Sequence, residues 1–274
     1  MGDFVKKVIY YVDELNDEFA NDSIQAKVID ESFEYLGRTK RKIGHLFWYK
    51  IVARPLAYVF LKLWFGHKIV GKKKLLDVIK HNNISKKGIF LYGNHTNGLA
   101  DALIPSMISY PKDAYVVVHP NNVSMPILGD ITPSLGALPL PDNREAARNF
   151  FEALQYYVDN KDTITIYPEA HIWPYYTKIR PFKELSFRYP LQYDASVYCF
   201  TNVYRKRRFR KTPRIITFVD GPFTADQHLS NAQKKKALRD KVYKTMVKRS
   251  RYNNVEMIKY IKKIENNRIH DLSH

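Results

Sequence analysis

The chain has 274 residues, a length that allows one large domain or two smaller ones. Apolar residues make up 45% of the chain, which is enough for a sizeable core and excludes a disordered or low-complexity protein. Lysine and arginine number 45 against 27 aspartates and glutamates, and the net charge of +18 favours an anionic partner: a nucleic acid, an acidic lipid surface or an acidic carrier protein.

Residues 1–42 are predicted to form a helical N-terminal extension. Phe4, Val8 and Leu15 recur at helical spacing, and residues 21–23 (Asn-Asp-Ser) can end one helix and cap the next. The chain has no charge-free apolar run of about 18 residues, so an ordinary membrane-spanning helix is not expected.

Residues 43–70 are predicted to hold one or two helices that lie in a membrane interface. They include the most apolar stretch of the chain, IGHLFWYKIVARPLAYVFLKLWF. Trp48 and Trp64 suit the level of lipid headgroups, and the long cations Lys50 and Arg54 would extend from the interface to the water. The alternative is a buried helix of an ordinary soluble core.

Residues 71–222 are predicted to form an α/β core with a mixed, mostly parallel sheet flanked by helices. Short apolar runs typical of strands alternate there with amphipathic segments typical of helices. The expected strands are residues 88–92, 114–119, 163–167, 196–200 and 214–219, and the expected helices are residues 143–158 and 182–193.

Residues 223–274 are predicted to form a basic helical tail that packs one face on the sheet or on the N-terminal helices. Just before this tail, residues 205–211 (RKRRFRK) are the densest basic cluster and should form a loop between two strands. We expect this cluster to meet a lipid surface or an acidic acyl carrier, and no nucleic acid, because no nucleic-acid-binding motif is visible.

Residues 93–101 (GNHTNGLAD) follow a predicted buried strand, a place where sites gather in open α/β sheets. His95 can act as a general base, and the carboxylate of Asp101 can hold its tautomer and stabilise the imidazolium. The two residues would lie about 240° apart on a regular helix, so their pairing requires a turn. Asn97 and Gly98 supply the turn chemistry.

Further segments follow in a recognisable order. Besides NHTNGLAD they are PILG at 126–129, GALPL at 136–140, YPEAH at 167–171 and RPFK at 180–183. Together they resemble the sequence blocks of the glycerolipid acyltransferase family, which includes 1-acylglycerol-3-phosphate acyltransferase, over roughly residues 50–220. That family has four residues between its His and Asp, whereas five separate His95 from Asp101 here.

The resemblance implies O-acyl transfer by a glycerolipid-acyltransferase-like core. His95 would take the proton of an acceptor hydroxyl, and Asp101 would orient His95. The acyl donor would be a thioester of acyl carrier protein or coenzyme A, and the acceptor a lyso-lipid, with 1-acylglycerol 3-phosphate as the first candidate. Backbone N–H groups near Gly136 or Glu169 would stabilise the tetrahedral oxyanion.

The resemblance also implies substrate-binding residues. The basic position after Pro-Glu in the family is Ile172 here, so other cations must bind an acceptor phosphate. The residues expected to bind substrate are Asn94, Gly136, Arg144, Glu169, Arg180 and Lys183. No cofactor and no metal are expected, because the chain has no H-E-x-x-H motif and no pair of cysteine ligands.

These expectations place the protein on the cytoplasmic face of the cell membrane, as a peripheral or monotopic enzyme of phospholipid biosynthesis that meets an anionic membrane surface. Three alternatives stay open. The chain could be an acyltransferase for a lyso-lipid without phosphate or for a polar alcohol, or a catalytically inactive family member that only binds lipid. It could also be a basic nucleic-acid-binding protein, which would leave the apolar stretch and the ordered blocks unexplained.

Overall fold

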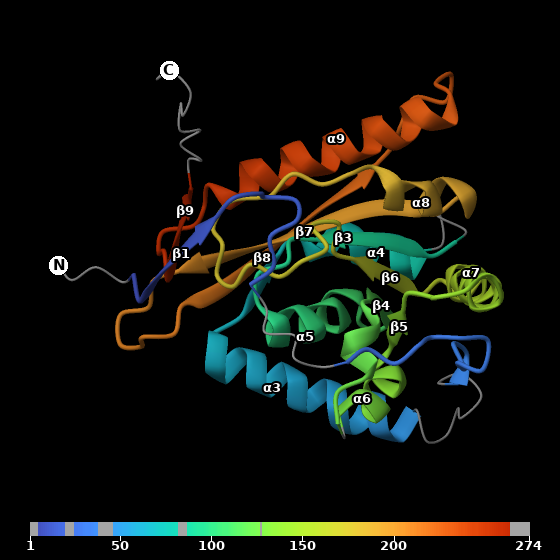
Figure 1. Cartoon of the computed structure of the whole chain (residues 1–274), viewed down its shortest axis with the longest axis horizontal. Helices are drawn as coiled ribbons and strands as arrows, with labels where there is room; N and C mark the ends of the chain where they lie inside the picture. Colours follow the sequence, from blue (N-terminus) through green and yellow to red (C-terminus); the bar gives the residue numbers. More distant parts are fainter. Residues whose placement is uncertain (1–4, 20–24, 38–45, 82–86, 127, 264–274) are drawn as a thin grey trace, which may run out of the picture.

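The computed structural model describes residues 5–19, 25–37, 46–81, 87–126 and 128–263. Its main sheet is made of β2 (Lys68–Val70), β3 (Ile89–Gly93), β4 (Ala114–Val118), β5 (Ala137–Pro139), β6 (Thr163–Ile166), β7 (Ser196–Arg205) and β8 (Arg214–Phe223). The strand order is β2-β8-β7-β3-β6-β4-β5, and all neighbours run parallel except the antiparallel pair β7 and β8. The expected mixed, mostly parallel sheet is therefore confirmed (Figure 1).

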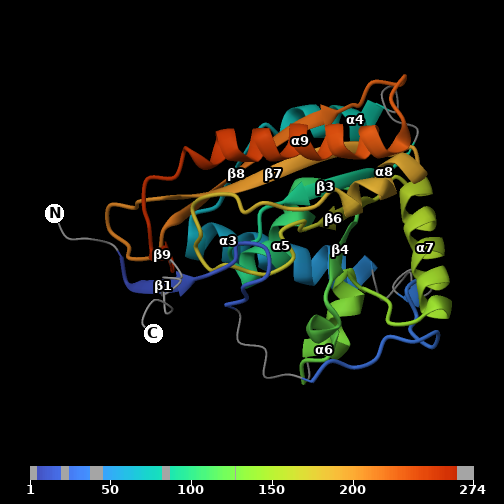
Figure 2. The same cartoon turned by 45° about the horizontal axis from the view of Figure 1, so that its top comes forward.

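The longer helices are α3 (Arg54–Phe65), α4 (Lys72–His81), α5 (Gly98–Ser109), α7 (Arg144–Asp159) and α9 (Asn231–Ser250). Shorter helical segments are η1 (Leu46–Ala53), η2 (Pro120–Val123), α6 (Leu128–Ile131), η3 (Thr132–Leu135), η4 (Leu185–Phe187) and α8 (Arg188–Gln192). In Figures 1 and 2, α9 covers one face of the sheet, and α3 and α5 lie on the other.

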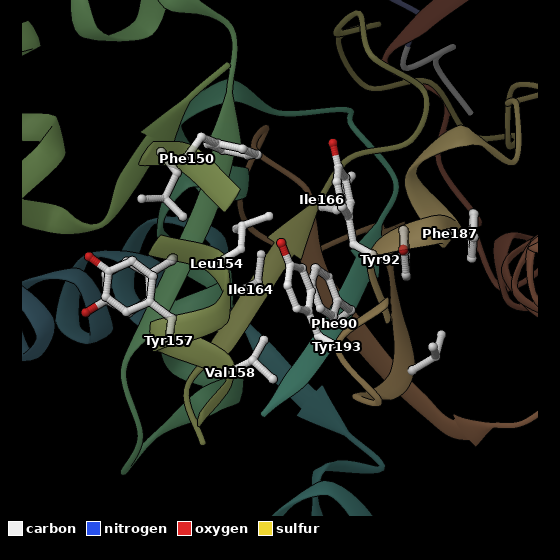
Figure 3. Packing of buried hydrophobic residues seen from close by; sticks show 14 of the residues in the cluster. Phe90, Tyr92, Phe150, Leu154, Tyr157, Val158, Ile164, Ile166, Phe187 and Tyr193 are labelled. Atoms are coloured by element: carbon white, nitrogen blue, oxygen red, sulfur yellow. The ribbon is translucent and has the colours of Figure 1, made fainter. Parts of the chain in front are cut away.

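The sheet separates two apolar cores, and the alternation of side chains along β3 shows why. Phe90 and Tyr92 point into the core with α7, α8 and α9, whereas Ile89 and Leu91 point into the core with α3, α4 and α5. A strand that is buried on both faces needs a continuous run of apolar residues. The sequence of β3, IFLYG, is such a run. Figure 3 shows side chains of β3, β6 and α7 meeting in the first of these cores.

The N-terminal region differs from the expected helical extension. Its residues form the strand β1 (Lys7–Tyr11), which pairs in parallel with β9 (Ile258–Lys262), while Phe4 lies outside the described residues. The sequence of β1, KVIYY, is rich in β-branched and aromatic residues, and a partner some 250 positions away supplies its hydrogen bonds. Long-range pairing has overridden the local helical spacing.

Residues 25–36 are also not helical but extended or in turns, and they are bound to the core. The N–H of Ile29 donates to Asp142 Oδ2 at 2.7 Å, and the hydroxyl of Tyr35 donates to the Pro139 carbonyl at 3.0 Å. These hydrogen bonds, to the end of β5 and to the segment that follows it, stabilise an extended chain without a helix.

The C-terminal region is helical only in part. The expected helix is α9, which begins with a capping box formed by Ser230 and Gln233 and buries Leu238, Val242 and Met246 against the core. The strand β9 then replaces the expected continuation of the helix, because it pairs with β1. Residues 264–274 lie outside the described part of the chain.

The other expected elements have two different outcomes. All five expected strands are present, and α7 matches the helix expected at residues 143–158. The helix expected at residues 182–193 is reduced to η4 and α8. Pro190 is accommodated in the first turn of α8, but a proline would break a helix that continued from residue 182.

Residues 46–65 form consecutive helical segments, with Pro55 in the first turn of α3. One cation of this stretch does not extend to the water as expected. Arg54 is buried, donates to the Tyr49 hydroxyl at 3.0 Å and the Lys112 carbonyl at 2.8 Å, and lies 3.7 Å from Asp113. Among the described helices, none combines the length and apolar character needed to cross a membrane.

The fold buries His67, the second residue after α3. Its Nε2 lies 2.8 Å from the Thr217 hydroxyl, and burial, with a smaller contribution from Lys62, lowers the pKa of His67 to about 4. The unfolded chain binds this proton below about pH 6.5, whereas the folded chain binds it only below about pH 4. Acidification between these values therefore favours the unfolded state.

We predict that His67→Gln flattens the acid side of the stability profile. Between pH 7 and pH 5 the wild type should lose about 2 kcal/mol more unfolding free energy than this variant, because the variant has no imidazole to protonate on unfolding. Denaturant unfolding at both pH values measures the difference, with His119→Gln at an exposed histidine as the control. Equal losses in wild type and His67→Gln would contradict the prediction.

Candidate active site

The His95 and Asp101 side chains meet between the end of β3 and the start of α5. His95 Nδ1 lies 3.0 Å from Asp101 Oδ2, so the five-residue spacing does not keep the two apart. The turn expected at Asn97 is present: Asn97 caps α5, and its side chain accepts a hydrogen bond from Ala100 N–H at 3.1 Å. The chain reverses in this turn, which returns Asp101 to His95.

The Asp101 carboxylate is buried and bonded at both oxygens. Oδ2 accepts the backbone N–H groups of Thr96 and Asn97, each at 2.8 Å, in addition to His95 Nδ1. Oδ1 accepts the side-chain amide of Asn202 at 3.1 Å. A carboxylate with these donors takes its hydrogen bond from the Nδ1–H of His95, and Nε2 then carries the free lone pair.

A buried polar chain extends from Asp101 across the sheet, and sequence reasoning did not find it. The Thr217 hydroxyl donates to Asn202 Oδ1 at 2.6 Å, and His67 Nε2 lies 2.8 Å from the Thr217 oxygen. The side chains of Asp101, Asn202, Thr217 and His67 are all buried, whereas His95, at the end of the chain, is partly exposed. The signal in the sequence is Asn202 itself, the one amide side chain of β7, a strand made mainly of apolar and aromatic residues.

Tyr167 also contacts the pair. Its ring stacks on His95 with centroids 4.4 Å apart, and its hydroxyl donates to the Asp101 carbonyl at 2.5 Å. Gly93 makes room for this ring, since a Cβ there would lie 2.8 Å from Tyr167 and 2.2 Å from Phe200. The His95 side chain keeps 20% of its surface exposed, so a substrate can reach it.

Glu169 and Arg180 position the loop that carries His95. The Glu169 carboxylate accepts the backbone N–H of His95 and that of Arg180, each at 3.1 Å. The Arg180 guanidinium is fully buried and donates to the carbonyls of Glu14, Glu169 and His171. Burial raises the pKa of Glu169, and the nearby Arg180 opposes that rise. These contacts correct the expectation that Arg180 binds a substrate phosphate.

Asn94 is likewise part of the framework and not a substrate ligand. Its side-chain amide donates to the Asn202 carbonyl at 3.1 Å, and its side-chain oxygen accepts the Asn202 N–H at 2.7 Å. Asn94 is buried. The Asn94 side chain thus joins the end of β3 to Asn202 in the middle of β7, and Asn202 also donates a hydrogen bond to Asp101.

Gly136 is far from the His95 pair. The strand register places it level with Phe90, three strands away, which is on the order of 14 Å across the sheet. Its N–H donates to the Pro133 carbonyl, so it is not the expected oxyanion donor. The N–H groups of Ala170 and His171, next to Glu169, are also used within their own turn.

The two remaining cations are exposed. Arg144 is the first residue of α7 and lines a shallow hollow between α7 and α8 whose lining does not include His95. Lys183 follows Phe182, which packs in the core, and its own side chain is exposed. The structure thus brings together His95, Asp101, Asn94, Glu169 and Arg180, and leaves Gly136, Arg144 and Lys183 outside that cluster.

We predict that Asn202→Leu destabilises the protein by about 2 to 3 kcal/mol, because it leaves Asp101 Oδ1 and the Thr217 hydroxyl without this partner at nearly constant side-chain volume. Thr201→Val is the matched control. Its hydroxyl is buried without a hydrogen-bond partner among the described residues, so the loss should stay within about 0.5 kcal/mol. Denaturant unfolding compares the two; equal effects would mean that the Asn202 bonds contribute nothing.

Comparisons with known proteins agree with this fold. Residues 75–203, which include the His95 pair, Glu169 and Asn202, match the family model described as Acyltransferase. The fold is similar to the crystal structure of PlsC, the 1-acyl-sn-glycerophosphate (LPA) acyltransferase from Thermotoga maritima. The identity is 16% and the TM-score 0.54, over 79% of this chain and 85% of that chain.

No curated protein sequence matches the chain. The family match runs from within α4 to within β7, and this range includes the His95 pair. The match identifies residues 75–203 as an acyltransferase domain, so the chain is an acyltransferase enzyme, and its fold is similar to that of PlsC.

Proposed function

We propose that the enzyme moves a fatty acyl group from a thioester to a hydroxyl of a lyso-glycerolipid, in phospholipid biosynthesis. The donor is acyl carrier protein or coenzyme A, and 1-acylglycerol 3-phosphate is the first candidate acceptor. The observation that carries the proposal is the 3.0 Å contact from Asp101 to Nδ1 of a partly exposed His95. This contact leaves Nε2 as the base.

The reaction needs one base and no covalent enzyme intermediate. Nε2 of His95 takes the proton of the acceptor hydroxyl while its oxygen attacks the thioester carbonyl. The tetrahedral intermediate collapses with cleavage of the carbon–sulfur bond, and the imidazolium returns the proton to the leaving thiolate. Asp101 stabilises the imidazolium through both steps without taking its proton.

Cys199 does not suit the role of a nucleophile. It lies within β7, is fully buried in the apolar core, and burial raises the pKa of its thiol well above the ordinary value. A thiol in this state can neither ionise readily nor reach a substrate. Direct transfer at His95 is therefore the simpler route.

The buried Arg180 is not available to bind an acceptor phosphate. Arg180 is committed to three backbone carbonyls and to Glu169, so a phosphate must use other cations. Arg144 and Lys183 remain the candidates beside matching sequence blocks. The commitment of Arg180 is also a reason to keep a second candidate function, acyl transfer to a lyso-lipid without phosphate or to a polar alcohol.

A membrane surface is the proposed setting, on the cytoplasmic face of the cell membrane. Large apolar side chains of η1 and α3 face the solvent, which is unusual for a soluble protein. They are Phe47, Trp48, Ile51, Leu56, Tyr58, Val59, Leu63 and Trp64. The same helix buries Ala57, Leu61 and Phe65 toward α5, so α3 has two apolar faces. The outer face suits peripheral or monotopic binding to lipid.

We predict that His95→Ala lowers kcat by roughly 10²- to 10⁴-fold, the usual contribution of a general base. Thioester consumption measures the rate, and circular dichroism checks the fold. His228→Ala, at an exposed histidine before α9, is the control and should leave turnover unchanged. Turnover of His95→Ala at the wild-type rate would remove His95 from the mechanism.

The acceptor can be identified by direct competition. Acyl products from 1-acylglycerol 3-phosphate and from phosphate-free 1-acylglycerol are compared by mass spectrometry. If a phosphate is recognised, Lys183→Gln or Arg144→Gln should raise the KM for the phosphate-bearing acceptor several-fold and leave the KM for the donor unchanged. Faster use of the phosphate-free acceptor, or no change in either variant, would support the second candidate function.

A further inference from the structure

The connection between β7 and β8 carries an unusual concentration of charge. We call residues 205–214 (RKRRFRKTPR) the basic hairpin. It has seven basic residues and no acidic one. Burial and repulsion from the neighbouring Arg210 and Arg214 lower the pKa of Arg207. Cations crowded in this way would gain from an external anion.

The basic hairpin is attached to the end of α3. Arg207 Nη2 donates to the Trp64 carbonyl and Arg210 Nη1 to the Leu63 carbonyl, each at 3.0 Å. These are terminal carbonyls of the helix, which lack partners within the helix and carry its partial negative charge. In Figures 1 and 2 the hairpin extends past this end of α3. Hairpin and helix thus form one surface.

The tip of the basic hairpin is apolar. Phe209 is 86% exposed, the highest value among the large hydrophobic side chains of the described residues. The Arg208 guanidinium lies over its ring, 5.2 Å from the centroid. An exposed ring beside cations suits the boundary between lipid headgroups and acyl chains, where the ring enters the apolar layer and the cations stay with the phosphates.

We propose that the basic hairpin is a second membrane contact, which binds the anionic headgroups of a lipid surface while the outer face of α3 enters the apolar layer. This inference rests on the proposed membrane setting but not on acyl transfer. A nucleic acid would offer anions but no extended apolar layer, and a carrier protein would offer only a small contact area. A lipid surface supplies both anions and an apolar layer, which would cover Leu63 and Trp64; these side chains are 65% and 55% exposed directly beside the hairpin.

The test is vesicle co-sedimentation of the full chain without substrate. Vesicles of phosphatidylcholine alone are compared with vesicles that contain about 30% phosphatidylglycerol. The double variant Arg208→Gln with Lys211→Gln removes two exposed hairpin charges and keeps Arg207 and Arg210, whose side chains bond to α3. Lys236→Gln with Lys244→Gln removes two exposed charges from α9 as the matched control. Trp48→Glu with Trp64→Glu disrupts the apolar face.

The wild type should bind anionic vesicles far better than neutral ones, and the hairpin variant should lose roughly 10- to 30-fold of that affinity. The α9 control should change less than about threefold. The tryptophan variant should weaken binding to both kinds of vesicle. Circular dichroism confirms that each variant is folded.

Three outcomes would overturn the inference. Equal binding of the wild type to both vesicles would reject the hairpin's role and leave the membrane setting intact. Equal losses in the hairpin and α9 variants would mean that only net charge matters. A hairpin variant that binds vesicles normally but has a raised KM for acyl carrier protein would assign the hairpin to the carrier. A protein that binds vesicles as expected but transfers no acyl group would contradict the proposed reaction and leave the inference about the hairpin intact.

Discussion

The buried carboxylate of Asp101 is the constraint on which the site depends. Its four hydrogen bonds come from His95, from the backbone of the turn at Thr96 and Asn97, and from Asn202 on β7. A buried charge is tolerated only when it is fully bonded, so the turn, α5 and the sheet must hold one relative position. That requirement fixes the tautomer of His95 and the direction in which its ring points.

A second buried charge pair supports the same loop from behind. Glu169 holds the backbone of His95, and Arg180 is satisfied largely by carbonyls, including that of Glu14 near the N-terminus. Removing one partner of such a pair costs more than the pair contributes, because the other charge is left buried. The N-terminal segment is therefore part of the site's support, although it lies far from the catalytic residues in sequence.

The surface proposals follow from the two-sided character of α3. One face of α3 packs in the apolar core on one side of the sheet. The opposite face is also apolar, and no other element of the described chain covers it. The basic hairpin stands at the end of this helix, bonded to its terminal carbonyls. Apolar insertion and headgroup attraction would then act on one rigid surface, so that membrane binding responds to both lipid packing and lipid charge.

The sequence by itself determined the elements whose cause is local. Central strands buried on both faces, such as β3, appear as continuous apolar runs, and His95 and Asp101 are close enough in sequence for one turn to pair them. Only the tertiary structure decided the rest. The partner of β1 lies some 250 residues away, and local helical spacing carries no trace of it. Arg180 and Lys183 look alike in sequence, yet burial against carbonyls makes the first a support and exposure leaves the second available, because the role of a cation depends on the groups around it.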